Sequence, residues 1–226
     1  MNLKRLRRKV VRLAAGYRPG GTWSRYGETC GYGQVAQQAK LVAVERFLRS
    51  TRPSRVLDLG CNTGQYSRLA AGLGAEVIAA DADHDAVEIL YRQLRREPAP
   101  ITPMVVDLCN PSPAVGLMNR ERAAWGPRAE SDCVLALALL HHLLVAGNLP
   151  LSAVCEVLAG LTRRDLVLEF IPHDDPLFQR LLEFRVDLLA GLTLDACREV
   201  FCRRFELLAE EPIPETRRTL LLLRKK

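Results

Sequence analysis

Short apolar runs alternate with helical patterns from Arg55 onward, and this alternation limits the possible folds more than any other feature of the chain. Apolar runs of five to eight residues are typical of buried strands, and apolar residues three or four positions apart are typical of helices. Strands that alternate with helices form a parallel sheet covered on both faces. The sequence therefore predicts an α/β domain with a mostly parallel sheet of seven strands.

The predicted elements follow one another with short connections. The predicted strands are Arg55–Leu59, Glu76–Ala80, Thr102–Val106, Cys133–Leu140, Asp165–Phe170, Phe205–Ala209 and Arg218–Leu223. The predicted helices are Val35–Arg49, Gln65–Gly72, Asp85–Arg96, Leu151–Leu161, Pro176–Leu189 and Leu194–Arg204. Because Pro212-Ile213-Pro214 is too short a link for a crossover helix, we expect the last two strands to form a C-terminal antiparallel hairpin.

Residues 1–50 are predicted to form an N-terminal helical extension and a lid rich in aromatic residues and glycine. Leu3, Leu6, Val10 and Leu13 recur at helical spacing among basic residues, which predicts a short amphipathic helix. The Pro19-Gly20-Gly21 run ends it. Residues 51–226 then make up the main domain, since 226 residues with 48% hydrophobic content suffice for one α/β domain and a short appendage.

The net charge of +6 comes mainly from basic clusters near the two ends of the sequence. Such clusters can contact nucleic acid or a membrane surface, but solubilising segments are the simpler interpretation. A nucleic-acid partner is therefore allowed but not favoured. The most apolar stretch, Cys133 to Ala146, is broken by His141-His142 and is shorter than the roughly 20 residues of a membrane span. We predict no membrane span, and the sequence leaves the oligomeric state open.

The seven cysteines lie mostly within apolar runs and include no Cys-x-x-Cys pair. No secretory signal precedes them, so we interpret them as reduced thiols of a cytoplasmic protein. No metal site is predicted.

Val56 to Gly64 reads as a buried strand that runs into a glycine turn and then a helix. Gly60 and Gly64 can adopt backbone conformations closed to other residues, which lets backbone amides approach a ligand. A glycine turn alone is weak evidence, because dinucleotide sites and ordinary strand-to-helix turns use it too. The acidic Asp58 at the strand end narrows the choice.

The segment Asp58-Leu59-Gly60-Cys61-Asn62-Thr63-Gly64 resembles the first motif of class I S-adenosylmethionine-dependent methyltransferases. The resemblance implies a Rossmann-like fold over residues 51–226 and S-adenosylmethionine as the cofactor. It also implies that Asp58 lies near the amino group of the cofactor's methionine part, where an ammonium must be paired. Residues 60–64, including Cys61, Asn62 and Thr63, would surround the cofactor.

Further aspartates follow the second and third predicted strands. Asp81 is the first candidate for a carboxylate that accepts hydrogen bonds from both ribose hydroxyls, and Asp83 is the second candidate for this role. Asp107 resembles the acidic residue that many members of the family place at the adenine amino group, with Leu108 beside it. Any one of them could be a helix cap, but three at successive strand ends favour a binding site.

All four histidines follow predicted strands, at the edge where open α/β sheets bind ligands. If the methyl acceptor is a hydroxyl, a base must take its proton, and His142 is the first candidate and His141 the second. Glu169 or His173 would orient the acceptor, and Glu169 would alternatively hold an amine acceptor or be a buried, hydrogen-bonded carboxylate.

A narrower resemblance covers most of the chain between Trp23 and about Leu182. It is to a bacterial methyltransferase group that includes nodulation-associated proteins. The matching segments are Trp23-Ser24-Arg25-Tyr26, Asn62-Thr63, Asp107-Leu108 with Pro111 to Gly116, His141 to Val145, and Leu168 to Pro172 with Asp174-Asp175-Pro176. Leu117-Met118 departs from the pattern where an aromatic residue is expected. Trp23 and Tyr26 would cover the site or pack on the core.

Three function classes follow from these patterns. The first is a methyltransferase for a small-molecule acceptor, with sugar-containing compounds and secondary metabolites as the leading candidates. The second is an RNA or protein methyltransferase that docks through its basic termini, although the Asn/Asp-Pro-Pro-Tyr type of tetrapeptide is absent from the sequence. The third is a non-catalytic module that binds the cofactor.

Overall fold

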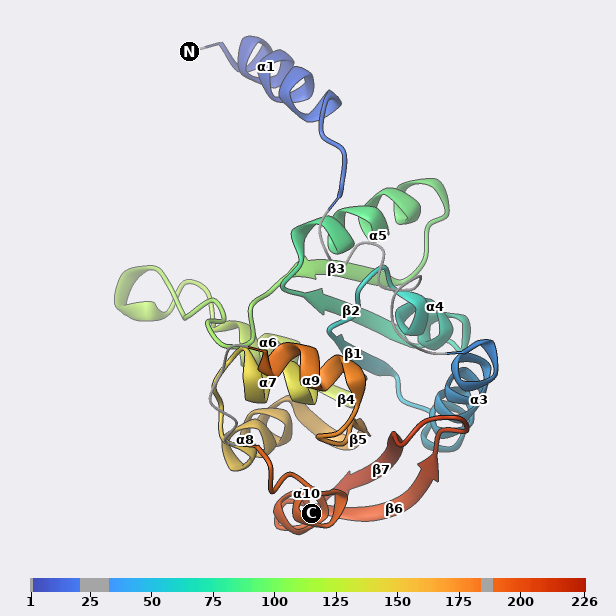
Figure 1. The fold of residues 1–226 in the computed structure, drawn as a ribbon. Helices are drawn as coiled ribbons and strands as arrows, with labels where there is room; N and C mark the ends of the chain where they lie inside the picture. The colour runs from blue at the N-terminus through green and yellow to red at the C-terminus, as the bar shows by residue number, and fades with distance from the viewer. Residues whose placement is uncertain (1, 21–32, 184–188) are drawn as a thin grey trace.

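A seven-stranded sheet forms the centre of the molecule in the computed structural model, which describes residues 2–20, 33–183 and 189–226 (Figure 1). The strand order is β3-β2-β1-β4-β5-β7-β6. The strands are β1 Arg55–Leu59, β2 Glu76–Asp81, β3 Ile101–Val105, β4 Ser131–Ala136, β5 Thr162–Phe170, β6 Phe205–Pro212 and β7 Thr219–Lys225. β1 to β5 pair in parallel, whereas β7 is antiparallel to β5 and β6. The predicted fold class and C-terminal hairpin are confirmed.

Helices cover both faces of the sheet, and one helix stands apart from it (Figure 1). The helices are α1 Leu3–Ala15, α3 Gln34–Thr51, α4 Gln65–Gly72, α5 His84–Arg96, α6 Trp125–Ala129, α7 Leu140–Val145, α8 Leu151–Leu161, α9 Pro176–Leu182 and α10 Leu194–Phe201. Side chains of α3, α4 and α5 belong to the core on one face, and side chains of α6 to α10 belong to the core on the other. None of the helices in the described ranges is both long and apolar enough to cross a membrane.

Alternate residues of β1 supply these two cores, which explains its unbroken apolar run. Val56 packs in the core with Phe47 of α3, and its neighbour Leu57 packs in the opposite core with Leu158 of α8. Successive side chains of a strand point to opposite faces, so a strand buried on both sides carries apolar residues throughout. The same reasoning applies to β4, which lies beside β1.

The predicted strand Cys133–Leu140 is too long, and this prediction is wrong at its C-terminal end. β4 ends at Ala136, Ala138 has a positive φ of 50°, and α7 begins at Leu140. Every residue of the run is apolar, so periodicity carries no sign of the change from strand to helix. The predicted helix Pro176–Leu189 also ends early, at Leu182, and residues 184–188 lie outside the described part of the chain.

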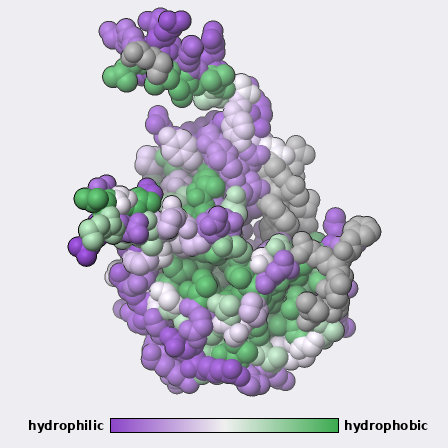
Figure 2. Space-filling model, turned by 90° about the vertical axis from the view of Figure 1, so that its left-hand side faces the viewer, coloured by the Kyte–Doolittle hydropathy of each residue, from purple (hydrophilic) through white to green (hydrophobic). Residues whose placement is uncertain are grey.

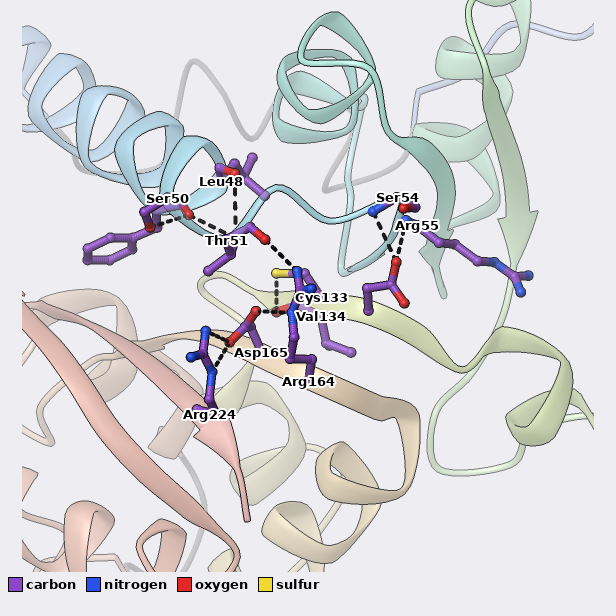
Figure 3. Close-up of polar contacts among 12 residues, drawn as sticks. Leu48, Ser50, Thr51, Ser54, Arg55, Cys133, Val134, Arg164, Asp165 and Arg224 are labelled. Carbon is purple, nitrogen blue, oxygen red and sulfur yellow. Dashed lines mark hydrogen bonds and ion pairs between the residues drawn. The ribbon is translucent and has the colours of Figure 1, made fainter.

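Polar contacts fasten the N-terminal edge of the sheet to α3, on the side opposite the strands' carboxyl ends (Figure 3). Asp165 is buried and accepts hydrogen bonds from Arg164 Nε at 2.8 Å and from Arg224 Nε at 3.0 Å. The Arg164 guanidinium also donates to the backbone carbonyl of Thr51, at the end of α3. This edge is therefore occupied by structural contacts.

The middle of the long connection between β3 and β4 projects from the domain as a separate loop, whereas α6 at its end packs in the core (Figure 1). Val115 and Arg122 pair in an isolated bridge at its base, and a short 3₁₀ helix, Leu117–Asn119, forms its tip. The side chains of Leu117 and Met118 are largely exposed there. Long loops of this kind are often lids or binding loops, and we predict such a role here.

Candidate functional site

A cavity of about 720 Å³ opens at the carboxyl ends of β1, β2 and β4. It lies at the point where the strand order reverses, since β1 is followed along the chain by β2 on one side and is flanked by β4 on the other. Open α/β sheets bind ligands at such a reversal. The residues around the cavity come from α3, from the turn after β1, and from the segments after β2, β3 and β4.

The turn after β1 has the tight backbone that its glycines permit. Gly60 and Gly64 have φ values of 69° and 87°, in the left-handed region that favours glycine. A Cβ on Gly64 would lie 2.5 Å from Leu90 Cδ1, so a side chain there would push α5 away from α4. Asn62 also has a positive φ, of 50°. Gly60, Cys61, Asn62 and Thr63 line the cavity.

Asp58 reaches the cavity floor from the end of β1 and is only 2% exposed. The Ser67 hydroxyl donates a hydrogen bond to Asp58 Oδ2 at 2.6 Å. Burial raises the pKa of Asp58 to about 6, and the Ser67 hydrogen bond and the charge of Lys40 offset only part of this effect. The ionised carboxylate is therefore under-compensated, and a cationic ligand group would stabilise it.

Asp81 ends β2 and holds the two loops that border the cavity. Its Oδ2 accepts from the backbone N–H of Asn62 and its Oδ1 from that of Asp83, both at 2.8 Å. A carboxylate oxygen has two lone pairs, so each oxygen keeps capacity for a ligand hydroxyl. Burial raises the pKa of Asp81 above its ordinary value.

Asp83 and Asp107 also line the cavity but differ from Asp81 in what they bind. Asp83 is the N-cap of α5, where its Oδ1 accepts from the backbone N–H groups of Asp85 and Ala86 at 2.8 and 3.2 Å. Asp107 is exposed beyond β3, and its Oδ1 accepts from the backbone N–H of Cys109 at 2.8 Å. Leu108 lies beside it on the cavity wall.

The histidine pair lies on α7, and only one of its members reaches the cavity. His142 lines the cavity, whereas His141 is buried at 2% exposure behind it, with the ring centroids 4.1 Å apart. Burial lowers the pKa of His142 to about 4, and burial followed by the charge of His142 lowers the pKa of His141 well below its usual value. Both rings are therefore neutral near pH 7.

Glu169 lies at the end of β5, fully buried in a network of charges, and is not on the cavity wall. Its Oε2 is 2.7 Å from Lys40 Nζ and accepts from the backbone N–H of Ala138 at 2.8 Å. Its Oε1 is 3.8 Å from Nη1 of Arg218. The Nε and Nη2 atoms of the same guanidinium donate hydrogen bonds to Asp175 at 2.7 and 3.1 Å. Two buried cations thus face two buried carboxylates.

Of the remaining predicted residues, His173 does not line this cavity. His173 lines a smaller hollow with Phe170, Asp174 and Arg217, where Gln179 donates to its backbone carbonyl at 2.7 Å. Trp23 and Tyr26 lie outside the described residues. The roles assigned to these residues stay predictions.

Lys40, the cation at the centre of this network, is not among the site residues predicted from the sequence. Lys40 is 5% exposed, lines the cavity and lies 5.2 Å from the centre of the Tyr66 ring. A signal for it exists, because Lys40 lies four residues after Ala36 and four before Val44, on the buried face of α3. A lysine at such a position needs a partner within the protein.

Comparisons with known proteins agree with this geometry. Residues 33–151 match a family model described as a methyltransferase domain. The nodulation protein NoeA of Rhizobium meliloti is 31% identical over 199 residues, a match that covers 88% of this chain and 42% of the relative. The chain thus spans less than half the length of this curated relative.

Solved structures with the same fold include two methyltransferases. Magnesium protoporphyrin IX methyltransferase (ChlM) from Synechocystis, with bound SAH, has a TM-score of 0.64 at 18% identity, covering 95% of this chain and 99% of that one. The N-methyltransferase NodS from Bradyrhizobium japonicum has a TM-score of 0.62 at 12% identity, covering 85% and 97%. At these identities the likeness shows the shared Rossmann-like fold.

Proposed function

Because the chain belongs to the family of methyltransferase domains, we propose that it methylates a small-molecule acceptor bound in the cavity after β1, β2 and β4. Family membership confirms the predictions of an S-adenosylmethionine-dependent methyltransferase and of its cofactor. It also confirms the resemblance to nodulation-associated proteins, since NoeA is a relative. The acceptor and the activity of the whole protein belong to the proposal.

One observation carries the proposal: the glycine motif, the strand-end aspartates and His142 border the same cavity. They come from four segments that are far apart in the sequence, and the sheet brings their ends to one edge. A cavity of about 720 Å³ lies within the roughly 300–1,000 Å³ range of small-molecule sites. If these residues served only to stabilise the fold, they would not need to line one cavity.

The lining residues fit S-adenosylmethionine. Asp58 would pair with the ammonium of the methionine part, which would return its raised pKa toward the ordinary value. Asp81 would accept from the ribose hydroxyls through its remaining lone pairs. Asp107 and Leu108 would contact the adenine. When bound, S-adenosylmethionine supplies a methyl group on a positively charged sulfur, which is a good leaving group.

His142 is the proposed base on the acceptor side of the cavity. Its ring is neutral at pH 7 because burial lowers its pKa to about 4, and a neutral imidazole is the form that can accept the proton of an acceptor hydroxyl or amine. His141 packs against it and limits its orientation. Lys40 borders the same space, and its ion pair with Glu169 fixes the ammonium in position to orient a polar acceptor.

The basic residues near the C-terminal end do not support docking of a macromolecular acceptor. Arg224, Lys225 and Lys226 near the C-terminal end donate hydrogen bonds within the fold, to Asp165 and to backbone carbonyls. They are therefore already used in holding the domain together. ChlM, a structural neighbour, is a methyltransferase of magnesium protoporphyrin IX, itself a small molecule.

The test combines calorimetry with transfer of a labelled methyl group to a panel of sugars, amines and secondary metabolites. We expect micromolar binding of S-adenosylmethionine, about −8 kcal/mol. Asp81→Ala should weaken binding by about 1.5–3 kcal/mol, the scale of hydrogen bonds to a charged group. Asp83→Ala is the matched control, because Asp83 caps α5 and should affect the affinity less.

Each competing function predicts a different result. Binding without transfer to any acceptor would indicate a non-catalytic module. Salt-dependent transfer to RNA would indicate the nucleic-acid enzyme. Absence of heat and of a thermal shift with either S-adenosylmethionine or its demethylated product would contradict the cofactor site itself.

A further inference from the structure

The helix α1 stands clear of the domain and buries none of its residues (Figure 1). The side chains of Leu3, Val10 and Leu13 are 80%, 56% and 79% exposed, respectively. An amphipathic helix in a globular protein normally buries its apolar stripe against the core. In the described part of the chain, nothing covers the stripe of α1.

The two faces of α1 differ in chemistry as well as in exposure. Figure 2 shows hydrophobic side chains along one flank of the helix at the top of the molecule and hydrophilic ones along the other. The apolar flank carries Leu3, Leu6, Val10 and Leu13, which recur at intervals of three or four residues. The helix also carries six basic residues and no acidic one, namely Lys4, Arg5, Arg7, Arg8, Lys9 and Arg12.

The basic side chains of α1 make no ion pair with any residue in the described ranges. The basic residues near the other end of the sequence behave differently, since Arg224 pairs with Asp165 and Lys225 donates to the carbonyls of Ala159 and Thr162. Only the N-terminal cluster therefore leaves its charge available to a partner. A partner that binds this cluster must be anionic. To cover the apolar flank as well, it must also offer a nonpolar environment.

We propose that α1 binds in the plane of an anionic lipid membrane, with Leu3, Leu6, Val10 and Leu13 inserted between headgroups and the basic face on the lipid phosphates. A helix with a basic face and an apolar stripe binds such interfaces through both attractions together. A nucleic acid would use the cations but leave the apolar stripe in water. Two copies of α1 packed on each other would bring like charges together with no acidic residue to offset them.

The residues that follow α1, up to Gly20, contact the domain. Binding of the helix to a membrane would therefore hold the whole molecule at the membrane surface. The Tyr17 hydroxyl is 3.2 Å from His84 Nδ1, and the backbone N–H of Gly20 donates to Asp85 Oδ2 at 3.0 Å. Both contacts are to the first turn of α5, next to Asp83 on the cavity wall.

The test is flotation of the full chain with vesicles of phosphatidylcholine alone or with about a third of phosphatidylglycerol. We expect binding to the mixed vesicles only, and a decrease at high salt. Arg8→Gln with Arg12→Gln should weaken this binding about thirtyfold, since each basic residue near an anionic surface contributes about a factor of five. Leu6→Gln with Val10→Gln should weaken it at least tenfold.

Matched controls use side chains of the same kind elsewhere on the surface. Val42→Gln with Val157→Gln replaces apolar side chains that are 50% and 39% exposed, close to the 56% and 39% of Val10 and Leu6. Arg95→Gln with Arg96→Gln removes two exposed charges from α5. Both control variants should float as the unchanged protein does, and all four should keep its melting temperature.

Three outcomes would overturn the proposal. The first is no binding to the anionic vesicles by a folded protein. The second is binding to RNA that depends on Arg8 and Arg12 but not on Leu6 and Val10, which would indicate a nucleic-acid partner. The third is a dimer in light scattering that dissociates in the Leu6→Gln, Val10→Gln variant, which would assign the stripe to a second copy. The result is independent of any methyl transfer.

Discussion

The two halves of the carboxyl edge of the sheet differ in how their carboxylates are compensated. After β1 and β2, Asp58 and Asp81 accept hydrogen bonds from Ser67 and from backbone amides, and burial raises the pKa of each. After β5, Glu169 is as buried as Asp58 but is paired with Lys40 and lies near Arg218. The first half has a deficit of positive charge, and the second half is balanced.

This difference indicates which half would be stabilised by a charged ligand. A buried carboxylate without a full counterion costs free energy, and a cationic ligand removes that cost when it binds. A carboxylate that is already paired gains little from a ligand, but it can hold a neighbouring cation in place. The aspartate half therefore suits the ammonium and hydroxyl groups of the cofactor, and the paired half suits orientation of an acceptor.

The largest expected effect is on the acceptor side, with His142→Ala. We expect turnover to fall by roughly 10²–10⁴-fold, the usual range for loss of an acid or base, while cofactor affinity stays within about threefold. Because burial lowers the pKa of His142 to about 4, the ring stays neutral between pH 8 and pH 5.5. Protonation of His142 should therefore not lower turnover of the bound complex in this pH range.

This prediction is checked by labelled methyl transfer at saturating cofactor, with His84→Ala as the control because His84 is exposed on α5. An equal loss in cofactor affinity would mean that His142 shapes the cofactor pocket. Full turnover in both His142→Ala and His141→Ala would exclude a histidine base and favour alignment alone or a role for Glu169.

Breaking the balanced half should lower stability. Glu169→Gln leaves Lys40 without the carboxylate that lies 2.7 Å from its ammonium in a buried site, and loss of one partner of such a pair costs about 3–5 kcal/mol. Denaturant unfolding measures the change. Glu156→Gln is the control, because its side chain is 61% exposed and its pairing with Arg204 is long, at 3.7 Å.

A double variant separates charge from packing in this prediction. Lys40→Met with Glu169→Gln removes both charges and should recover part of the loss, since no buried cation is left unpaired. If the Glu169→Gln variant alone unfolds like the unchanged protein, then the network contributes little and the contrast between the two halves is weaker than its geometry indicates.

The aspartate half should show the opposite response to charge removal. Folded Asp58 has a pKa of about 6, above its ordinary 3.8, so its contribution to stability is fully present below pH 3.8 and is lost as the pH rises through 6. Asp58→Asn should therefore stabilise the ligand-free protein at pH 7 by about 1–2 kcal/mol. The gain should shrink as the pH is lowered to 4.

Cofactor binding gives an independent check on Asp58. The pairing with an ammonium needs the ionised carboxylate, so affinity should fall up to tenfold for each pH unit below about 6. Calorimetry between pH 5 and 8 measures this slope. In Asp58→Asn the affinity should be lower at pH 7 and should lack the inflection; a variant that binds as well as the unchanged protein would remove Asp58 from the cofactor site.

The smallest expected effect is from removal of residues 1–15. Because α1 has no buried residue, the shortened chain should keep its melting temperature within about 2 °C and its affinity for the cofactor. Thermal melting and calorimetry check both. An insoluble or unfolded product would show that the apolar stripe of α1 belongs to the core.

Local sequence determined much of the sheet and of the aspartate half of the site. The bounds of β1, α4 and α8 coincide with the predicted ranges, because their apolar periodicity and the glycine turn between β1 and α4 act within a few residues. Aspartates at successive strand ends meet at one edge once the strands are parallel, so Asp58, Asp81 and Asp107 were predictable together.

The tertiary structure alone decided the acceptor half and the contrast between the two basic clusters. Lys40 and Glu169 come from α3 and β5, and no local pattern pairs residues so far apart in the chain. The change from β4 to α7 within one apolar run, which puts His142 on the cavity wall and His141 behind it, depends on what each side packs against. The same holds for charge: the sequence shows that both ends are basic, but only the packing of β7 engages Arg224 and Lys225 while α1 stays exposed. Periodicity sets local conformation, whereas the pairing and burial of side chains depend on which distant segments the fold brings into contact.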